Sequence, residues 1–151
     1  SLALAADGAV WSWGGGGLGE LGHGDRQRQL LPKKIEAFAG QRVVAMSAAI
    51  YHSLALTADG AAWSWGEAAE GQLGHGDTQR QLLPKKVEAF AGRRVVAVSA
   101  GTSHSLARTA DGAVFTWGKG EDARLGQGEA LSKQLLPKKV EAWPPSTPAS
   151  A

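Results

Sequence analysis

The side chains best suited to chemistry in this sequence are four histidines, and all four occur in repeated contexts. His52 and His104 precede the same Ser-Leu-Ala segment, whereas His23 and His75 belong to the same Leu-Gly-His-Gly-Asp loop. Imidazoles can bind a metal ion or transfer a proton. Residues one repeat apart lie on different structural units, however, and the third copy of the loop carries Gln127 instead. We therefore expect His52 and His104 to be structural histidines that bond nearby backbone groups, and we expect no ligand role for His23 and His75.

A run of four glycines, 14–17, resembles a loop that could cradle a phosphate. It lacks the Gly-Lys-Ser/Thr ending of such loops, and no helix is expected after it to direct its N-terminus at a phosphate. Asp25 and Asp77 are expected to form turns by bonding local backbone amides. The sequence thus predicts no catalytic, cofactor-binding or metal-binding residue, and we expect a protein that is not an enzyme.

Basic residues recur at equivalent positions of each copy and form the one candidate binding site: Arg28, Lys33, Lys34, Arg80, Lys85, Lys86, Lys133, Lys138 and Lys139. If the copies are equivalent units, these residues form an arc on one rim that could contact an acidic partner or phosphates. The alternative, which we favour, is a solvated face balanced by Glu36, Glu88 and Glu141. In either case, strand alternation predicts that one lysine of each pair points away from its sheet.

The elements that carry these residues repeat with a period of 52. The segment 63–86 returns at 11–34 and, degraded, at 115–139. Each period predicts four short strands, which in the middle copy are 61–65, 85–89, 94–99 and 105–109. The tryptophan strand is expected to be the first of its unit, Asp59-Gly60 predicts a hairpin turn, and Leu73, between glycines, is expected to point inward.

Four strands in about fifty residues are typical of a β-propeller blade, and a helical repeat would need a different apolar spacing. The expected fold is all-β, with blades of four antiparallel strands. The predicted strands number eleven, just under three blades, so the chain is expected to form an open arc. Unpaired blade edges at the ends of such an arc favour self-association.

The repeats resemble those of the regulator of chromosome condensation family. The resemblance rests on Trp-Gly at 65–66, Gly-Gln-Leu-Gly-His-Gly-Asp at 71–77, Pro84, the Val-rich segment 95–98, and the run from Gly101 to Gly112 with its His-Ser-Leu-Ala and Asp-Gly. It covers 1–143 and implies a fragment of a seven-bladed propeller. The boundaries expected from it are 1–7, 8–59, 60–111 and 112–143, followed by a Pro/Ser-rich disordered tail at 144–151.

The resemblance implies a protein-interaction scaffold with an unidentified protein partner. It also implies two alternatives: guanine-nucleotide exchange on a Ran-like small GTPase in a complete parent protein, and chromatin or nucleic-acid binding through the lysines. The net charge of +2 is small for a nucleic-acid binder. The chain contains no cysteine and no apolar run long enough to cross a membrane, so an intracellular location, cytoplasm or nucleus, is expected without membrane contact.

Overall fold

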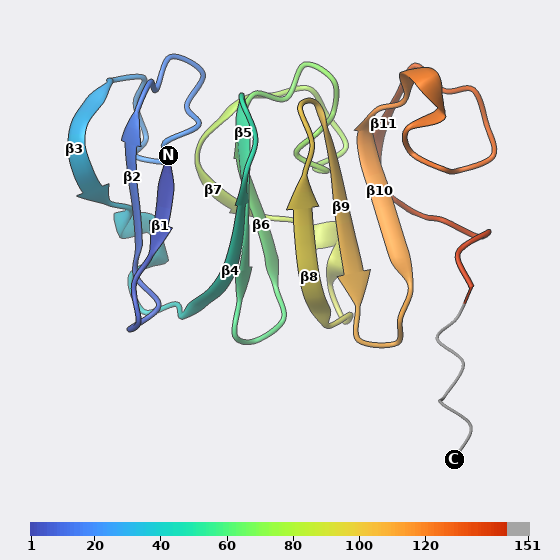
Figure 1. Cartoon of the computed structure of the whole chain (residues 1–151), viewed down its shortest axis with the longest axis horizontal. Helices are drawn as coiled ribbons and strands as arrows, with labels where there is room; N and C mark the ends of the chain where they lie inside the picture. Colours follow the sequence, from blue (N-terminus) through green and yellow to red (C-terminus); the bar gives the residue numbers. More distant parts are fainter. Residues whose placement is uncertain (145–151) are drawn as a thin grey trace.

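The computed structural model describes residues 1–144, so the expected tail lies outside the described residues except for Pro144. Three antiparallel sheets stand side by side in chain order (Figure 1). The first sheet contains β1 (Leu2–Leu4), β2 (Val10–Gly14) and β3 (Gln29–Lys34). The second contains β4 (Val43–Ala48), β5 (His52–Thr57), β6 (Ala62–Gly66) and β7 (Gln81–Lys86). The third contains β8 (Val95–Ala100), β9 (His104–Thr109), β10 (Val114–Lys119) and β11 (Lys133–Lys139).

This architecture confirms the expected all-β fold with four-stranded antiparallel blades. The only helical elements in residues 1–144 are the short 3-10 turns η1 (Glu36–Phe38), η2 (Glu88–Phe90) and η3 (Glu121–Ala123). None of the described residues forms a helix that is long and apolar enough to span a membrane.

The position of the tryptophan strand within its blade is a correction. The order of the second sheet is β4-β5-β6-β7, so Trp63 and Trp65 lie on its third strand and not on its first. Each complete blade begins with the Val-rich strand. The fourth strand is also displaced, since it covers 81–86 and Glu88 already belongs to a 3-10 turn. Pro84 lies within this strand, where an outer edge tolerates the missing N–H.

The predicted Asp-Gly hairpin is present between β5 and β6. The Asp59 carboxylate accepts hydrogen bonds from the Ala61 amide and the Thr57 hydroxyl, at 3.2 and 2.6 Å. Gly60 has a φ of +85°, a conformation that costs side chains with a Cβ about 1 kcal/mol. The equivalent turns of the other sheets line the same edge of the molecule, which we call the hairpin edge (bottom in Figure 1).

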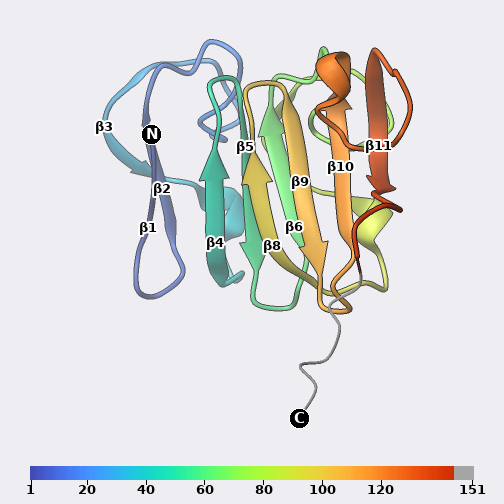
Figure 2. The same cartoon turned by 45° about the vertical axis from the view of Figure 1, so that its right-hand side comes forward.

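The glycine-rich loops 15–28, 67–80 and 120–132 lie along the opposite edge, which we call the loop edge (Figure 2). Leu73 is 1% exposed, so the prediction that it points inward is confirmed. A Cβ at Gly71 would lie 2.6 Å from Leu135 of the next blade, which explains why this position requires glycine. The first two loops are thereby packed against the outer strand of the following blade, with Gly19 against Leu82 and Gly71 against Leu135.

The core lies between the sheets rather than inside any one of them. Leu54 and Leu56 of the second sheet face Trp117 of the third, and all three are buried. The phenyl ring of Phe90, from the turn that connects the two sheets, packs edge-on against Trp117 with ring centroids 5.7 Å apart. Phe38 packs in the same way against Trp65 between the first and second sheets. We call each such interface between neighbouring sheets a joint. The repeat therefore buries its apolar residues only by stacking on its neighbours.

Candidate functional site

Each joint between sheets is closed by one main-chain carbonyl of the preceding glycine loop. The carbonyl of Gln72 accepts hydrogen bonds from Trp117 Nε1 and Ser105 Oγ, both at 2.8 Å. At the preceding joint, the carbonyl of Glu20 accepts from Trp65 Nε1 at 2.9 Å and Ser53 Oγ at 3.1 Å. These indoles and hydroxyls are therefore structural, because their donors are already used.

His52 adds a third bond to the joint between the second and third sheets. Its Nε2 lies 2.9 Å from Ser105 Oγ, and the side chain is fully buried. Because the serine hydrogen is directed to the Gln72 carbonyl, the imidazole must donate from Nε2. Burial, and secondarily the charge of His104, lowers the pKa of His52 to about 4, so the ring is neutral at pH 7. His52 therefore has a structural role, but its partner is a hydroxyl and not the expected backbone group, and the buried Nδ1 of His104 has no hydrogen-bond partner within residues 1–144.

The loop histidines have an equivalent role within each blade. Ser64 Oγ donates to the Leu73 carbonyl at 2.7 Å and lies 2.9 Å from His75 Nε2, which must therefore donate to it. Burial, then the charge of Lys85, lowers the pKa of His75 to about 4. In the third copy, Gln127 Nε2 donates to Thr116 Oγ1 at 2.9 Å. Glutamine replaces histidine here because the structure needs only a hydrogen-bond donor.

The glycine run and the two loop aspartates have local structural roles. Within residues 1–144, no group of three His, Cys, Asp or Glu side chains could hold a metal ion. Within the glycine run, a Cβ on Gly16 would lie 2.5 Å from the Gln27 carbonyl oxygen, whereas a Cβ on Gly17 would meet nothing within 4 Å. Asp25 and Asp77 accept bonds from the amides two residues later, at 2.9 Å each, as expected of turn residues.

The basic residues do not lie on a single rim. Lys34, Lys86 and Lys139 end the outer strands at the hairpin edge, whereas Arg28, Arg80 and Lys133 lie at the start of those strands, beside the loop edge. A six-residue strand separates its two ends by roughly 17–20 Å. The expected arc thus divides into two rows on opposite edges, joined along the outer strands by Lys33, Lys85 and Lys138.

The three copies differ in how many of these charges are matched by an ion pair. Arg80 pairs with Glu67 at 2.6 Å, Lys138 with Glu129 at 2.8 Å, and Lys139 with Glu141 at 3.7 Å. Lys133 donates to a backbone carbonyl. Of the nine candidate residues, Arg28, Lys33, Lys34, Lys85, Lys86 and Lys133 have no ion pair within the described part of the chain. The acceptors expected for the first two lysine pairs, Glu36 and Glu88, do not bind them.

Exposed leucines accompany these lysines on the outer strands. Leu31 and Leu83 are 77% and 50% exposed and lie two residues before Lys33 and Lys85 on their strands. The outer surface of the first two sheets therefore combines apolar side chains with unmatched positive charge. We call Leu31, Lys33, Lys34 and their equivalents Leu83, Lys85 and Lys86 the outer-strand patch.

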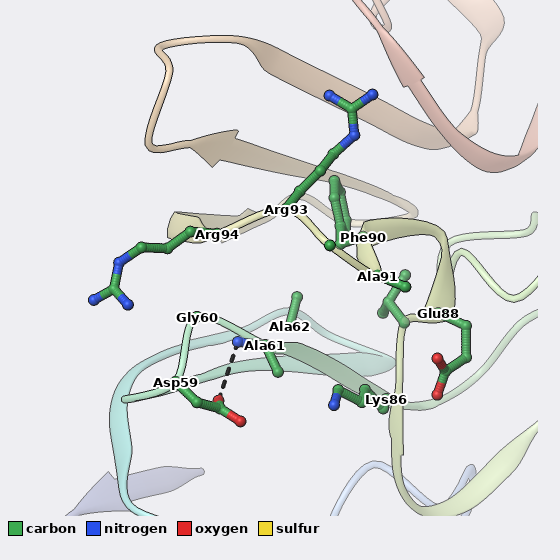
Figure 3. Close-up of a pocket in the computed structure, with 12 residues that line it drawn as sticks. Asp59, Gly60, Ala61, Ala62, Lys86, Glu88, Phe90, Ala91, Arg93 and Arg94 are labelled. Atoms are coloured by element: carbon green, nitrogen blue, oxygen red, sulfur yellow. Dashed lines mark hydrogen bonds between the residues drawn. The ribbon is translucent and has the colours of Figure 1, made fainter.

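Sequence reasoning missed a pair of arginines at the hairpin edge. Arg93 and Arg94 line a cavity of about 420 Å³ beside Asp59 and Lys86 (Figure 3). The two arginines point in different directions, and the Arg93 guanidinium lies over the Phe115 ring, 5.3 Å from its centroid. Because acidic and basic groups both line this cavity, it does not form a site selective for anions. The recurrence of arginine at the end of the same linker, Arg42 in the first copy, was the available signal.

The two end faces of the arc expose apolar side chains in the described structure. On the first sheet, Trp11 is 37% and Leu30 81% exposed. On the third, Trp143 is 53% exposed beside a cavity of about 280 Å³. Arg108 lies on this face at the position that Leu56 occupies in the second sheet. The third sheet thus carries a charge where the earlier joint is apolar.

Blades of antiparallel strands, stacked through a repeated joint, place this chain among β-propeller repeat proteins. The profile of the regulator of chromosome condensation (RCC1) repeat matches residues 7–56, 59–108 and 111–149. The chain belongs to this repeat family.

Similar proteins show that such repeats occur in large and varied proteins. The chain is 43% identical over 130 residues to human E3 ubiquitin-protein ligase HERC2, covering 85% of this chain and 3% of that protein. It is 41% identical over 131 residues to the ultraviolet-B receptor UVR8 of Arabidopsis thaliana, covering 87% and 30%. The crystal structure of Prp20p from Saccharomyces cerevisiae, described with its binding to Gsp1p and histones, superposes with a TM-score of 0.82 at 25% identity, covering 93% and 36%. The chain therefore spans less than a third of the length of HERC2 and of UVR8.

Proposed function

We propose that this chain acts as a protein-interaction scaffold, in which stacked blades hold the outer-strand patch in a fixed arrangement for a partner. The observation that supports this role is the set of four lysines, Lys33, Lys34, Lys85 and Lys86, that lack an ion pair among residues 1–144 and lie beside exposed leucines. A partner segment with carboxylates and apolar side chains would match both features. The equivalent positions on the third sheet are less suited, because their lysines are paired.

The test compares two variants of the 151-residue chain. One variant replaces Lys33, Lys34, Lys85 and Lys86 with glutamine, and the control replaces Lys138 and Lys139. Binding of a synthetic acidic peptide that contains glutamate and leucine is measured by fluorescence anisotropy. The fourfold variant should bind at least about tenfold more weakly, and the control about as well as the unmodified chain. Equal weakening by both variants, or no binding of the peptide, would refute the proposal.

Guanine-nucleotide exchange is a second candidate, favoured by the likeness to Prp20p and its described binding of Gsp1p. The first two repeats have the same length, so neither carries an extra insertion that could wedge into a GTPase. We therefore expect this chain, if it binds a purified Ran-type GTPase, to leave its nucleotide release unchanged. Release of a fluorescent GDP analogue measures this directly, and acceleration by the chain would favour exchange over a purely scaffolding role.

Chromatin or nucleic-acid binding through the lysines is the remaining candidate, and a 20-base-pair duplex serves as its probe. Phosphate contacts release counterions, so such binding weakens steeply with salt. The same glutamine variant separates the two ligands. Duplex binding that persists near physiological salt and is lost in the fourfold variant would favour nucleic acid, whereas binding of the acidic peptide alone favours a protein partner.

A further inference from the structure

The glycine loop of the second copy binds a carboxylate that belongs to the chain itself. Glu67 Oε1 accepts hydrogen bonds from the amides of Ala68 and Ala69, at 2.9 and 3.0 Å. Its other oxygen, Oε2, accepts from the Arg80 guanidinium at 2.6 Å. Burial acts to raise the pKa of Glu67, but the bonds from Arg80 and the two amides outweigh it and lower the pKa. Two amides and a guanidinium thus form a site that favours an ionised carboxylate.

The first copy has the same positions but lacks the carboxylate. Gly15 stands where the second copy has Glu67, and Arg28 stands where it has Arg80. The strands that flank the loop, β2 and β3, pair in the same register as β6 and β7. Gly15 and Arg28 are therefore placed relative to each other as Glu67 and Arg80 are.

The loop backbone also has the same internal hydrogen bonds in both copies. The Gly19 amide donates to the Gly16 carbonyl at 3.0 Å, and the equivalent bond of the second copy is 2.8 Å long. The Leu18 amide donates to the Glu20 side chain at 2.8 Å, and the equivalent bond is 2.9 Å long. The amides of Gly16 and Gly17 therefore correspond in position to the two amides that bind Glu67 in the second copy.

The three donors of the first copy are unmatched, and the space beside them is open. Within residues 1–144, the amides of Gly16 and Gly17 donate no hydrogen bond and Arg28 has no ion pair. Apart from its chain neighbours, a Cβ on Gly15 would meet only Glu20 Oε1, at 3.9 Å, and a Cβ on Gly17 would meet nothing within 4 Å. The loop thus has room for the side chain that Gly15 lacks.

The third copy shows that this arrangement is specific to the first loop. Lys119 occupies the position of Glu67 and pairs with Glu121 at 3.0 Å. The amide of the next residue, Gly120, already donates to the Ser132 carbonyl at 2.9 Å. In the described part of the chain, only the first loop therefore combines the free donors with an open position.

The second copy defines the ligand that fits. We propose that the loop 15–28, which we call the carboxylate loop, binds the side-chain carboxylate of a glutamate on a partner chain. One carboxylate oxygen accepts from the amides of Gly16 and Gly17, and the other accepts from the Arg28 guanidinium. The partner thereby supplies in trans the group that Glu67 supplies within the second copy. A single contact of this kind has a dissociation constant of millimolar order, so it acts as one anchor of a larger interface.

The probe is the capped tripeptide Ala-Glu-Ala, titrated into the isotope-labelled 151-residue chain at pH 7 and followed by NMR. A salt concentration of about 0.15 M screens long-range attraction by the lysines. The amide signals of Gly16 and Gly17 should shift to saturation. Those of Ala68 and Ala69, which already bind Glu67, should shift less. The capped tripeptide Ala-Gln-Ala should bind at least about tenfold more weakly, because it lacks the charge.

Four variants test the role of each group. Arg28→Gln should weaken binding at least about fivefold, whereas Arg26→Gln, with the same change of charge in the same loop, should leave it within about twofold. Glu20→Gln should strengthen binding about twofold to fivefold, because it removes a like charge beside the site and restores the glutamine of the second copy. Gly15→Glu combined with Glu20→Gln should abolish binding and should shift both loop amides toward their bound positions without peptide. Gly15 tolerates this change, since its φ is not positive.

The proposal is overturned if the glutamate tripeptide leaves both loop amides unshifted, or if the glutamine tripeptide binds equally. It is also overturned if Arg26→Gln weakens binding as much as Arg28→Gln. Tighter binding of inorganic phosphate than of the tripeptide would overturn the assignment to a carboxylate. The fourfold lysine variant of the outer-strand patch should bind the tripeptide within about twofold, because the carboxylate loop contains none of those lysines. This proposal and the scaffold proposal therefore succeed or fail separately.

Discussion

Lowering the pH from 7 to 5 is expected to weaken the joint between the second and third sheets, through His52. Burial lowers the pKa of this histidine to about 4, from 6.5 in an unfolded chain. Between these values the unfolded chain binds a proton that the folded chain excludes. The stabilisation by neutral His52 is therefore complete above pH 6.5 and is lost as the pH falls toward 4.

The magnitude follows from the two pKa values. Between pH 7 and 5, His52 should remove about 2 kcal/mol from the free energy of unfolding. Replacing His52 with alanine should cost about 2–4 kcal/mol at pH 7, because it leaves a cavity and removes the bond to Ser105. The variant should then lose about 2 kcal/mol less than the unmodified chain on acidification, since the titrating group is gone.

Urea-induced unfolding, followed by tryptophan fluorescence at pH 7 and pH 5, measures both effects. His104 supplies the matched control, because it occupies the same repeat position but has no counterpart of Ser105 within residues 1–144. Its replacement by alanine should cost about 1 kcal/mol or less. The reasoning would be refuted by a His52→Ala variant whose stability depends on pH as steeply as that of the unmodified chain.

Three further predictions concern the glycine loops and the ends of the arc. Gly71→Ala should destabilise the chain by about 2–4 kcal/mol, because it adds backbone strain at positive φ and a clash with Leu135. Ala123→Gly, at the equivalent position, should stabilise the chain by about 1 kcal/mol, because φ is already +54° there. An opposite order of melting temperatures would contradict this. His75→Gln should leave stability within about 0.5 kcal/mol, as Gln127 indicates, while His75→Leu should cost about 1 kcal/mol; equal losses in urea unfolding would show that the donor does not matter. The mass in solution, measured by light scattering, should rise with concentration and fall toward that of one chain in the Trp143→Glu variant; a mass independent of both would exclude association through this end face.

The fold was largely predictable because its signals are local. The Asp59-Gly60 turn fixes a hairpin through its own carboxylate and a glycine with positive φ, and both are visible in two adjacent letters. Leu73 could be placed inward because glycines on both sides allow the loop to close over it. Because the sequence repeats with a period of 52, each of these local predictions applies at the equivalent position of every copy.

The features that could not be predicted depend on contacts between repeats. A periodic sequence does not mark where a blade begins, so the strand of Trp65 was placed first although sheet pairing makes it third. The bond between His52 and Ser105 joins residues 53 positions apart on different sheets. The basic residues were expected on one rim because they are close in sequence. Arg80 and Lys86, however, lie at the two ends of one strand and therefore at opposite edges of the molecule.

The joint between blades has a consequence for how such proteins grow. Its donors, the indole and the serine, belong to one repeat, while its acceptor is a main-chain carbonyl of the repeat before it. A tandem duplication therefore supplies both halves of a new joint at once, and the added copy fits its parent without further change. Because the acceptor is a main-chain carbonyl, Glu20 and Gln72 serve equally well, and a side-chain oxygen of each also accepts from the amide two residues earlier. Repeat number can thus change in evolution more readily than the shape of a repeat.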